Sequence, residues 1–300
     1  MTVVFCNGID AAVPVITFAE SKTLALQIAL DRRGFSCSTI DGHWGRMSQV
    51  ALATYCAVNG YAVPPTPEMA KDILFPQETN LFRTDTVAQH EHTALVRIPA
   101  TPEGKAALKS MGYETIMEMY AERGHLTEGA LRRLNPGVAW PNPPVGTKIR
   151  IPNFASGQPA RPPKASILRV TLSRFEITAF DNKGRLIALF PCSIAAQRSK
   201  LPPAGELRVK TLIPDPDYTY TPDRVAKDGR ITRHMFPPGP NNPVGTSWIG
   251  LSLPGYGIHG TPRPERIGRA ESHGCFRLAN WNAVRLRKMC EAGTIVVVEP

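Results

Sequence analysis

The residues best suited to covalent chemistry lie between positions 256 and 277, where one cysteine, Cys275, is close to two histidines, His259 and His273. A thiol attacks a carbonyl carbon only as its thiolate, and a neighbouring imidazole is the usual group that removes the thiol proton near neutral pH. His273 and Cys275 are two positions apart, so their side chains point to the same side of an extended segment. His259 is far enough upstream for a return pass of the chain to bring it opposite the thiol. The segment therefore contains the parts of an acyl-transfer site.

Backbone groups and one arginine complete this hypothesis. Gly274 leaves the nucleophile open on one side, so the N–H groups of Gly274 and Cys275 are expected to form an oxyanion hole. The carbonyl of Gly260, or a neighbouring backbone group, is expected to fix the tautomer of His259. A guanidinium group binds a carboxylate through two parallel hydrogen bonds, so Arg277 is expected to orient a carboxylate of the substrate.

Several ordered pieces of sequence around this segment form a longer signature. They are Ile258-His259-Gly260-Thr261, Ile267-Gly268 and Ser272-His273-Gly274-Cys275-Phe276-Arg277-Leu278. Upstream, Pro202-Pro203-Ala204-Gly205 and Asn242-Pro243-Val244-Gly245 add a proline–glycine turn and an asparagine–proline–glycine loop. Over residues 165–299 the sequence resembles the L,D-transpeptidases, the YkuD-type cysteine enzymes of bacterial cell walls. One departure is Asn282, which stands where the family often has an acidic residue.

The resemblance assigns roles to the residues of the site. Cys275 is expected to be the nucleophile, His259 the principal proton donor and acceptor, and His273 a supporting group. Substrate-binding groups are expected at Tyr256, Gly260, Ser272, Gly274 and Arg277. The resemblance implies no cofactor, because the thioester keeps the energy of the cleaved amide. An alternative in which both histidines and the thiol are zinc ligands is disfavoured, because no fourth ligand stands at a zinc-like spacing.

The resemblance also implies a reaction. A donor stem peptide of peptidoglycan acylates Cys275 and releases its terminal D-alanine, and an amine of a neighbouring stem then accepts the acyl group to give a 3→3 cross-link. Water as acceptor would make the protein an L,D-carboxypeptidase, and a protein amine would make it a lipoprotein-anchoring transpeptidase. A non-catalytic cell-wall-binding protein that keeps the fold is a further alternative. The sequence leaves the acceptor open.

Composition limits the classes of protein. The chain has 300 residues, of which 42% are hydrophobic and 20% charged, which describes a soluble globular protein with room for two or three domains. The net charge of +10 suits an acidic partner, such as peptidoglycan stems or anionic wall polymers, although it also suits simple solubility. Nucleic acid is disfavoured as a partner because aromatic and basic residues are not interleaved. Stem peptides and glycan strands are the expected partners.

Location and disulfide state are less well determined by the sequence. No stretch approaches the roughly 20 apolar residues of a membrane helix, and residues 1–12 lack the basic and apolar regions of a signal peptide. The resemblance implies a cell-envelope location, periplasmic or extracytoplasmic. Apart from Cys275, the cysteines are expected to be buried small hydrophobes, with a Cys37–Cys56 bridge left open.

Residues 20–64 are expected to form a small helical domain. A helix from Lys22 ends at Gly34, and a second helix begins with Ser48 as its N-cap. The glycine and aromatic pattern around Asp41-Gly42 resembles a helical peptidoglycan-binding domain. Residues 68–90 are interpreted as a linker or a joining helix.

Residues 90–153 are expected to form a second small domain of the order βααβ. Its strands are predicted at 93–98 and 147–151, and its helices at 113–123 and around Leu131–Leu134. This pattern resembles a LysM module, which binds N-acetylglucosamine-containing glycans. An insertion at 101–111 departs from the family pattern, so a purely structural LysM-like domain is a close alternative.

Residues 164–300 are expected to form the catalytic domain, after a proline-rich spacer. Strands are predicted at 166–172, 174–180, 185–194, 206–213, 247–253 and 294–298. A helix is predicted from Asn280, as its cap, to Cys290, burying Trp281, Val284 and Leu286. The long loop 215–242 is a candidate lid. The expected fold is therefore multidomain: a mainly-β, YkuD-type β-sandwich preceded by a helical domain and a βααβ LysM-like domain.

Overall fold

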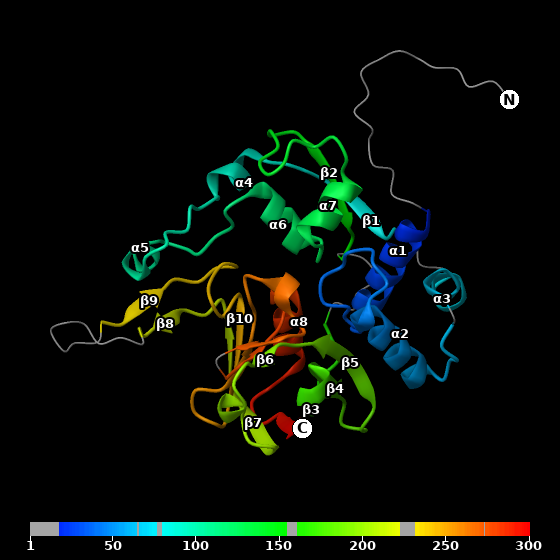
Figure 1. Cartoon of the computed structure of the whole chain (residues 1–300), viewed down its shortest axis with the longest axis vertical. Coiled ribbons are helices and arrows are strands. Elements are labelled where there is room, and N and C mark those ends of the chain that lie inside the picture. The colour runs from blue at the N-terminus through cyan, green and yellow to red at the C-terminus, as the bar shows by residue number, and fades with distance from the viewer. Residues whose placement is uncertain (1–17, 65, 77–79, 155–160, 223–231, 273) are drawn as a thin grey trace, which may run out of the picture.

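The computed structural model describes residues 18–300, with gaps at 65, 77–79, 155–160, 223–231 and 273. Its residues gather into three hydrophobic cores. We refer to residues 18–76 as the N-terminal unit, residues 80–154 as the middle unit and residues 164–300 as the C-terminal domain. The two smaller units lie against one side of the C-terminal domain (Figure 1).

Three helices make up the N-terminal unit: α1 (Phe18–Arg32), α2 (Arg46–Asn59) and α3 (Pro67–Leu74). Gly34 has a φ of +91° just after α1, which confirms the expected glycine at the end of that helix. The prediction that Ser48 caps α2 is wrong. The helix begins two residues earlier, and Ser48 is buried within it, where its Oγ accepts a hydrogen bond of 2.9 Å from Nε2 of Gln27.

Helix α1 is buried on two faces. Leu24 and Ile28 belong to the core of the middle unit, whereas Leu26 and Leu30 belong to the core of the N-terminal unit. Arg32, at the end of the helix, is buried as well, and its Nη2 donates to the carbonyl of Asn80 at 2.8 Å. The N-terminal and middle units are therefore packed around one shared helix.

The middle unit contains β1 (Phe82–Thr86), α4 (Gln89–Thr93), α5 (Pro102–Ala106), α6 (Ile116–Arg123), α7 (Glu128–Leu134) and β2 (Lys148–Pro152). Both predicted helices and the second predicted strand are confirmed. The predicted strand at 93–98 is wrong, because β2 pairs antiparallel with β1, from Phe82 opposite Pro152 onward. Residues 89–93 are helical instead, and the carboxylate of Glu91 accepts the N–H of Ala88 at 3.0 Å at the start of that helix.

The C-terminal domain is mainly β, as predicted. Its strands are β3 (Ile167–Thr171), β4 (Glu176–Phe180), β5 (Leu186–Pro191), β6 (Ile194–Ala195), β7 (Gly205–Pro214), β8 (Tyr218–Tyr220), β9 (His234–Phe236), β10 (Ser247–Leu251), β11 (Gly257–His259), β12 (Ala270–Ser272), β13 (Phe276–Arg277) and β14 (Ile295–Glu299). Three single turns, η1 (Leu172–Arg174), η2 (Arg198–Lys200) and η3 (Pro264–Arg266), and helix α8 (Asn280–Met289) complete it.

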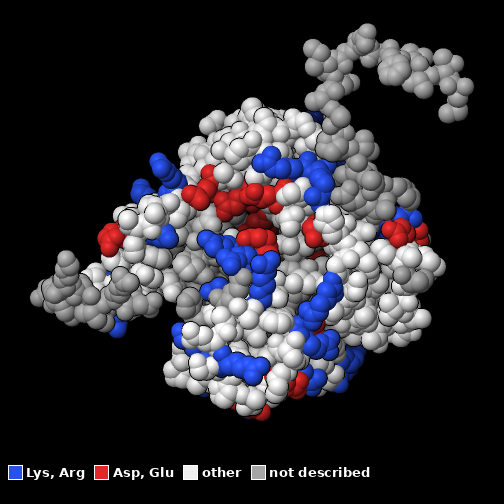
Figure 2. Space-filling model, viewed as in Figure 1, with Lys and Arg blue, Asp and Glu red and all other residues white. Residues whose placement is uncertain are grey.

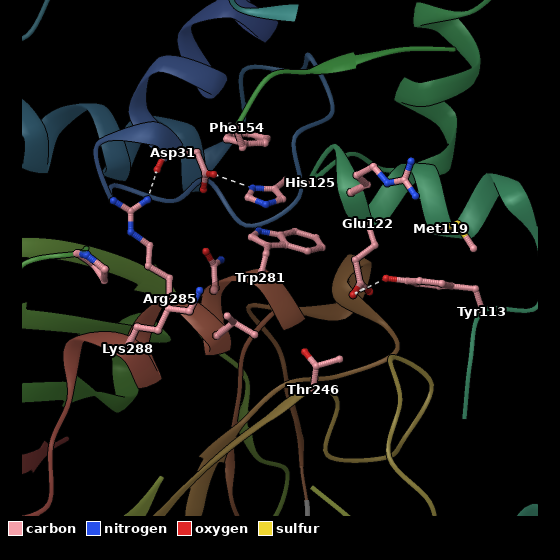
Figure 3. A pocket seen from close by; sticks show the side chains of 14 residues that line it. Asp31, Tyr113, Met119, Glu122, His125, Phe154, Thr246, Trp281, Arg285 and Lys288 are labelled. Carbon is pink, nitrogen blue, oxygen red and sulfur yellow. Dashed lines mark hydrogen bonds and ion pairs between the residues drawn. The ribbon is translucent and has the colours of Figure 1, made fainter. Parts of the chain in front are cut away.

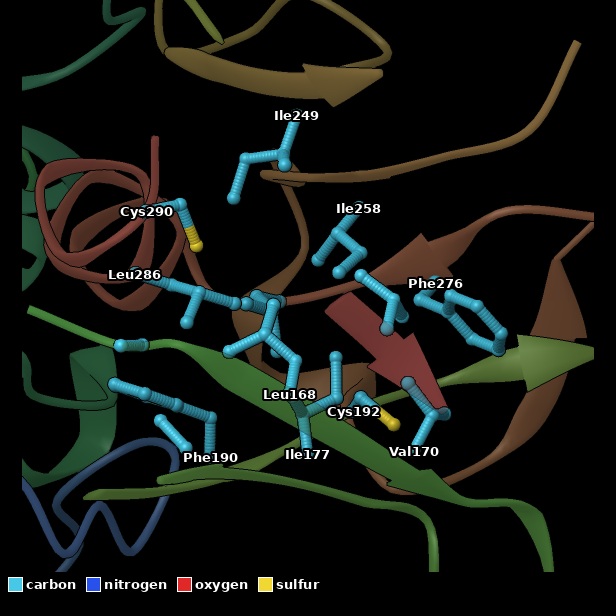
Figure 4. Close-up of a cluster of buried hydrophobic side chains, with 14 of the residues drawn as sticks. Leu168, Val170, Ile177, Phe190, Cys192, Ile249, Ile258, Phe276, Leu286 and Cys290 are labelled. Atoms are coloured by element: carbon cyan, nitrogen blue, oxygen red, sulfur yellow. The ribbon is translucent and has the colours of Figure 1, made fainter. Parts of the chain in front are cut away.

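Eight of these strands form one sheet in the order β13-β11-β10-β7-β14-β3-β4-β5. The long strand β7 pairs with β14 along its first half and with β10 along its second half, so it joins two halves of the sheet. The apolar side chains of both halves meet in one core, with Ile249 and Ile258 from one half and Leu168 and Ile177 from the other (Figure 4). Strand β14 lies inside the sheet, as predicted for its continuous apolar run.

Helix α8 covers one end of this core and also faces the middle unit. Leu286 is fully buried, as predicted, but Trp281 and Val284 are only half-buried. Asn280 is the first residue of the helix rather than its cap, which is Ala279. The prediction was wrong because the side chain of Asn280 bonds to partners outside its own helix, as described below.

The long loop 215–242 is held near its C-terminal end by the middle unit. It carries the hairpin β8–β9, in which Tyr218 pairs with Phe236. The N–H of Met111 donates to the carbonyl of Pro238 at 2.8 Å, and the N–H of Asn241 donates to the carbonyl of Met111 at 2.9 Å. The insertion at 101–111 therefore contacts the C-terminal domain. Residues 223–231 of this loop lie outside the described residues.

The described cysteines, Cys37, Cys56, Cys192, Cys275 and Cys290, are all free thiols, so the Cys37–Cys56 bridge that the sequence left open is not formed. Within the described ranges, no helix combines the length and the apolar character that a membrane span requires.

Candidate active site

The parallel pairing of β11 with β13 brings the predicted site together. Ile258 lies opposite Phe276 and His259 opposite Arg277. Ile258 and Phe276 are both fully buried and point into the core (Figure 4). Because side chains alternate along a strand, His259 and Arg277 lie on the other face, and Cys275, two positions before Arg277, lies at the start of the same row. The chain thus returns beside His259, with Arg277 as the residue directly opposite it.

His259 is held in one orientation and one tautomer. Its ring is 4% exposed and stacks on Trp248 with 5.6 Å between ring centres. Nδ1 of His259 lies 2.6 Å from the carbonyl oxygen of Gly260. A carbonyl can only accept, so Nδ1 carries the proton and Nε2 keeps its lone pair. Burial lowers the pKa of His259 to about 4, more than the bond to Gly260 raises it, so the ring is neutral at pH 7.

Cys275 is half-buried and protonated at rest. Burial raises the pKa of its thiol, more than the backbone hydrogen bond of Gly257 and the positive charge of Arg277 lower it. In this structure its Sγ donates to the carbonyl of Gly255 at 3.5 Å. The resting site therefore contains a neutral thiol just before β13 and a neutral imidazole on the neighbouring strand β11.

Ser272 organises the turn that precedes the thiol. Its Oγ donates to the carbonyl of Cys275 at 2.6 Å and accepts the N–H of Gly274 at 3.3 Å. One of the two N–H groups expected in the oxyanion hole is thus bonded to Ser272 here. Tyr256 lies beside the turn, where its hydroxyl donates to the carbonyl of Lys200 at 3.2 Å. His273 lies outside the described residues, and so does the zinc alternative that depends on it.

Arg277 borders a cavity of about 60 Å³ that the sequence did not predict. Its described lining residues are Ser193, Thr261, Arg263, Arg266, Ile267 and Arg277, so three arginines and no acidic residue are among them. Arg263 and Arg266 belong to the loop between two pieces of the signature. The sequence could have indicated both arginines, because they lie between His259 and Cys275 in the chain.

A larger hollow separates the middle unit from the C-terminal domain. One part, of about 540 Å³, is lined by residues that include Tyr113, Glu122, His125, Thr246 and Trp281 (Figure 3). An adjoining part, of about 560 Å³, is rich in carboxylates, namely Glu114, Glu118, Glu122, Glu128 and Glu265. Acidic side chains gather at this hollow in the space-filling view (Figure 2). The hollow follows from the packing of distant elements and left no local signal in the sequence.

A mainly-β domain that presents a cysteine and a neutral histidine on paired strands has the arrangement of a cysteine acyltransferase. Residues 165–298 match the family model of the YkuD L,D-transpeptidase catalytic domain. The match therefore identifies residues 165–298 as a YkuD-type L,D-transpeptidase catalytic domain.

The chain is also similar to individual proteins. The chain is 29% identical over 184 residues to the candidate L,D-transpeptidase YkuD of Bacillus licheniformis, which covers 61% of this chain and 93% of that protein. It is 36% identical over 112 residues to a candidate L,D-transpeptidase from the ATP synthase subunits region of Fuscovulum blasticum, which covers 37% of this chain and 57% of that protein. The NMR structure of the catalytic domain from the E. faecium L,D-transpeptidase is 24% identical, covers 45% of this chain and 98% of that chain, and has a TM-score of 0.35.

Proposed function

We propose that the protein forms 3→3 cross-links between peptidoglycan stem peptides through an acyl-enzyme on Cys275. The observation that supports this proposal is the pairing of β11 with β13, in which the buried, neutral His259 lies opposite Arg277, two positions after the thiol of Cys275. Because Nδ1 of His259 is bonded to Gly260, its Nε2 is the atom able to take a proton.

In the first half of the reaction, Nε2 of His259 takes the thiol proton, and Sγ of Cys275 attacks the carbonyl carbon of the third stem residue. The carbon–nitrogen bond to the terminal D-alanine then breaks, and His259 returns the proton to the leaving amine. The thiol must first turn away from the carbonyl of Gly255. Since the thiolate is not formed at rest, proton transfer and attack belong to the same step.

In the second half, a neutral amine of a neighbouring stem attacks the thioester carbon. His259 accepts a proton from that amine and passes it to the departing sulfur, which restores the thiol and leaves a new amide bond. Water or a protein amine in place of the stem amine gives the carboxypeptidase or anchoring reaction. The N–H groups of Cys275 and Gly274 are proposed to stabilise the oxyanion, the second after it leaves Oγ of Ser272. His273 is proposed to support this step.

Substrate orientation is proposed to depend on Arg277. The small arginine-lined cavity beside it suits a carboxylate of the stem peptide, because its described lining offers several guanidinium donors and no competing acid. Tyr256 and Gly260 border the same row of residues and are proposed to contact the stem.

The smaller units are proposed to hold the enzyme on the wall. The order of β1, α6, α7 and β2, with its two strands paired, supports a LysM-like fold and glycan binding for the middle unit. The helices of residues 20–64 are proposed as a second wall-binding domain. Tethering raises the local concentration of stems around the catalytic domain. The corresponding location is extracytoplasmic, in the cell envelope, with stem peptides and glycan strands as partners.

Incubation of the full chain with a purified tetrapeptide stem tests the proposal, with mass spectrometry of the products and of the protein. A 3→3 dimer and a transient acyl adduct on Cys275 are expected, and both disappear in Cys275→Ala. A tripeptide alone would assign the carboxypeptidase reaction, and an adduct with a protein amine would assign anchoring. Absence of any adduct on Cys275 would overturn the acyl-enzyme.

A further inference from the structure

A carboxylate of the middle unit contacts the C-terminal domain close to His259. Glu122, near the end of α6, faces the hollow (Figure 3), and both of its oxygens accept from Nδ2 of Asn280, at 3.2 and 3.0 Å. The hydroxyl of Tyr113 donates to Oε1 of Glu122 at 3.1 Å. Asn280 is 1% exposed, so this amide is held inside the domain interface with its donors directed at Glu122 and at the carbonyl of Pro240.

The other end of the Asn280 amide supports the backbone behind His259. Its Oδ1 accepts the N–H of Thr246 at 3.3 Å. The same oxygen lies directly against the Cα atoms of Gly245 and Gly260, so closely that a Cβ on either glycine would overlap it. A side chain at either glycine would therefore displace Asn280, and a displaced Asn280 would remove a close packing contact from Gly260.

Gly260 in turn determines the state of His259. Its carbonyl is the acceptor for Nδ1–H, and its N–H donates to the carbonyl of Ser247 at 3.1 Å. If the peptide of Gly260 rotates, the imidazole loses the partner that keeps the proton on Nδ1. The proton can then move to Nε2, the atom that has to be empty for the ring to act as a base.

We propose that Glu122 is a positioning residue for catalysis: through Asn280 it holds the Gly260 backbone and thereby the tautomer and orientation of His259. This inference rests on the proposed role of His259 as the base. It means that the middle unit is part of the active enzyme and not only a wall anchor. The hydrogen bonds between Glu122 of α6 and Asn280 of α8 complete the support of the site.

The charges around Glu122 do not replace it. On its own helix, Glu118 bonds to Nδ2 of Asn241 at 2.6 Å, and Arg123 points to Glu91. Across the hollow, His125 bonds to Asp31 on α1, while Arg285 of α8 donates to the carbonyl of Asp31. Lys288 and Tyr113 are the remaining titratable groups that line this part of the hollow. Glu122 is therefore the carboxylate that accepts the hydrogen bonds of the Asn280 side chain.

The first test measures the His259 tautomer without requiring activity. Long-range proton–nitrogen NMR on the full chain distinguishes Nδ1–H from Nε2–H. Wild type and Glu122→Gln are expected to show Nδ1–H, because a glutamine carbonyl still accepts from Asn280. Glu122→Ala is expected to show a mixture. Unchanged Nδ1–H in Glu122→Ala would overturn the proposal. Any failure of the transpeptidase reaction leaves this readout intact, so the two hypotheses fail separately.

The second test measures the rate at which Cys275 is acylated by the stem peptide. Glu122→Ala is expected to lower kcat about tenfold with KM within twofold, the lower end of what residues behind a functional imidazole contribute. Glu122→Gln is expected to keep most of the wild-type kcat. Glu118→Gln is the matched control, one turn away on the same helix, and is expected to stay within twofold of wild type. An equal loss in Glu118→Gln would mean that docking alone matters, which contradicts a specific role for Glu122.

A double-variant comparison protects the test against poor folding of Glu122→Ala. If Glu122 acts through Asn280, then Asn280→Ala together with Glu122→Ala is no slower than Asn280→Ala alone, whereas a general folding defect of Glu122→Ala would add to the loss. Additive losses in the double variant would overturn the route through Asn280.

Discussion

His259 in the active site and Glu122 at the unit junction are both ionisable groups that burial drives toward the neutral form, but with opposite consequences for pH. Burial lowers the pKa of His259 to about 4 and raises the pKa of Glu122 to about 7. In each case hydrogen bonds oppose the burial effect: the Gly260 carbonyl at His259, and the Asn280 amide and Tyr113 hydroxyl at Glu122.

The difference lies in what the neutral form is used for. At His259 the neutral ring with an empty Nε2 is the state that the proposed mechanism requires. At Glu122 the ionised form is the better acceptor, because both oxygens then receive the Asn280 amide. Near pH 7 the histidine is well away from its own pKa, whereas the glutamate is close to its own. The charge state of His259 in the active site is therefore constant near pH 7. The charge state of Glu122 at the junction changes with pH in the same range.

The largest effect that we expect concerns the active site itself. Cys275→Ala is expected to abolish acylation, because it removes the nucleophilic sulfur. His259→Gln is expected to lower the acylation rate by at least about a thousandfold, because it removes the proposed base. Stopped-flow or mass-spectrometric acylation rates measure this, with circular dichroism to show that the fold remains. A His259→Gln protein with a tenth or more of wild-type activity would remove the histidine from the mechanism.

The second effect is that His259 and Glu122 change the free energy of unfolding in opposite directions as the pH rises. His259 has a folded pKa below its ordinary value of 6.5, so the stability it contributes is complete above pH 6.5 and falls as the pH drops toward 4. Glu122 has a folded pKa above its ordinary value of 4.5, so its contribution is complete below pH 4.5 and falls as the pH rises through 7. Each of the two pKa shifts corresponds to a change in stability on the order of 3 kcal/mol across its pH range.

Urea unfolding at successive pH values separates the two groups. In His259→Gln the acid-side loss between pH 6.5 and 4 should largely disappear, and stability should fall with rising pH. In Glu122→Gln the loss between pH 4.5 and 7 should disappear. Identical pH profiles in both variants would show that neither region titrates as described.

A third effect concerns the close packing between the two regions. Gly245→Ala should destabilise the protein by about 2–4 kcal/mol, because its φ is +62° and a Cβ there would overlap the amide oxygen of Asn280. Gly60→Ala is the matched control, with a φ of +71° and open space around it, and should cost about 1 kcal/mol. Thermal or urea unfolding compares them; equal costs would mean that Asn280 moves aside freely.

The smallest effect concerns docking away from His259. Arg285 of α8 donates to the carbonyls of Asp31 and Arg32 at the end of α1, at 2.7 and 3.1 Å. Arg285→Gln should cost about 1–2 kcal/mol in unfolding free energy and leave acylation within twofold of wild type. Arg185→Ala, which removes an exposed hairpin ion pair with Asp181, should cost about 0.5 kcal/mol or less. A large loss of activity in Arg285→Gln would extend the catalytic role of docking beyond Glu122.

The catalytic strands were predictable because their signal is local. The signature around His259 and Cys275 is continuous, and alternation of buried and exposed positions then places both residues on one face. Strand β1 was not predictable in this way, since Arg83, Thr84 and Asp85 give it no apolar alternation, whereas the wrongly predicted strand at 93–98 has it by chance. What decided the outcome was the register with β2, a contact distant in sequence.

The errors at Ser48 and Asn280 have one cause. Both residue types favour helix starts, and each stands near one, but a partner from elsewhere claims the side chain: Gln27 for Ser48 and Glu122 for Asn280. The same reason hid Glu122 itself. Its role depends on the contact of α6 with Asn280 of α8, and no residue spacing within either helix predicts that contact.

The double burial of α1 has a practical consequence for anyone dividing this chain into pieces. A cut between residues 64 and 90 would remove Leu24, Ile28 and Ile40 from the interior that Ile116, Tyr120 and Leu131 need. Such a fragment would expose the apolar surface that α1 covers in the full chain, and it would tend to aggregate. The two small units should melt in a single step, and neither should be expressed without the other.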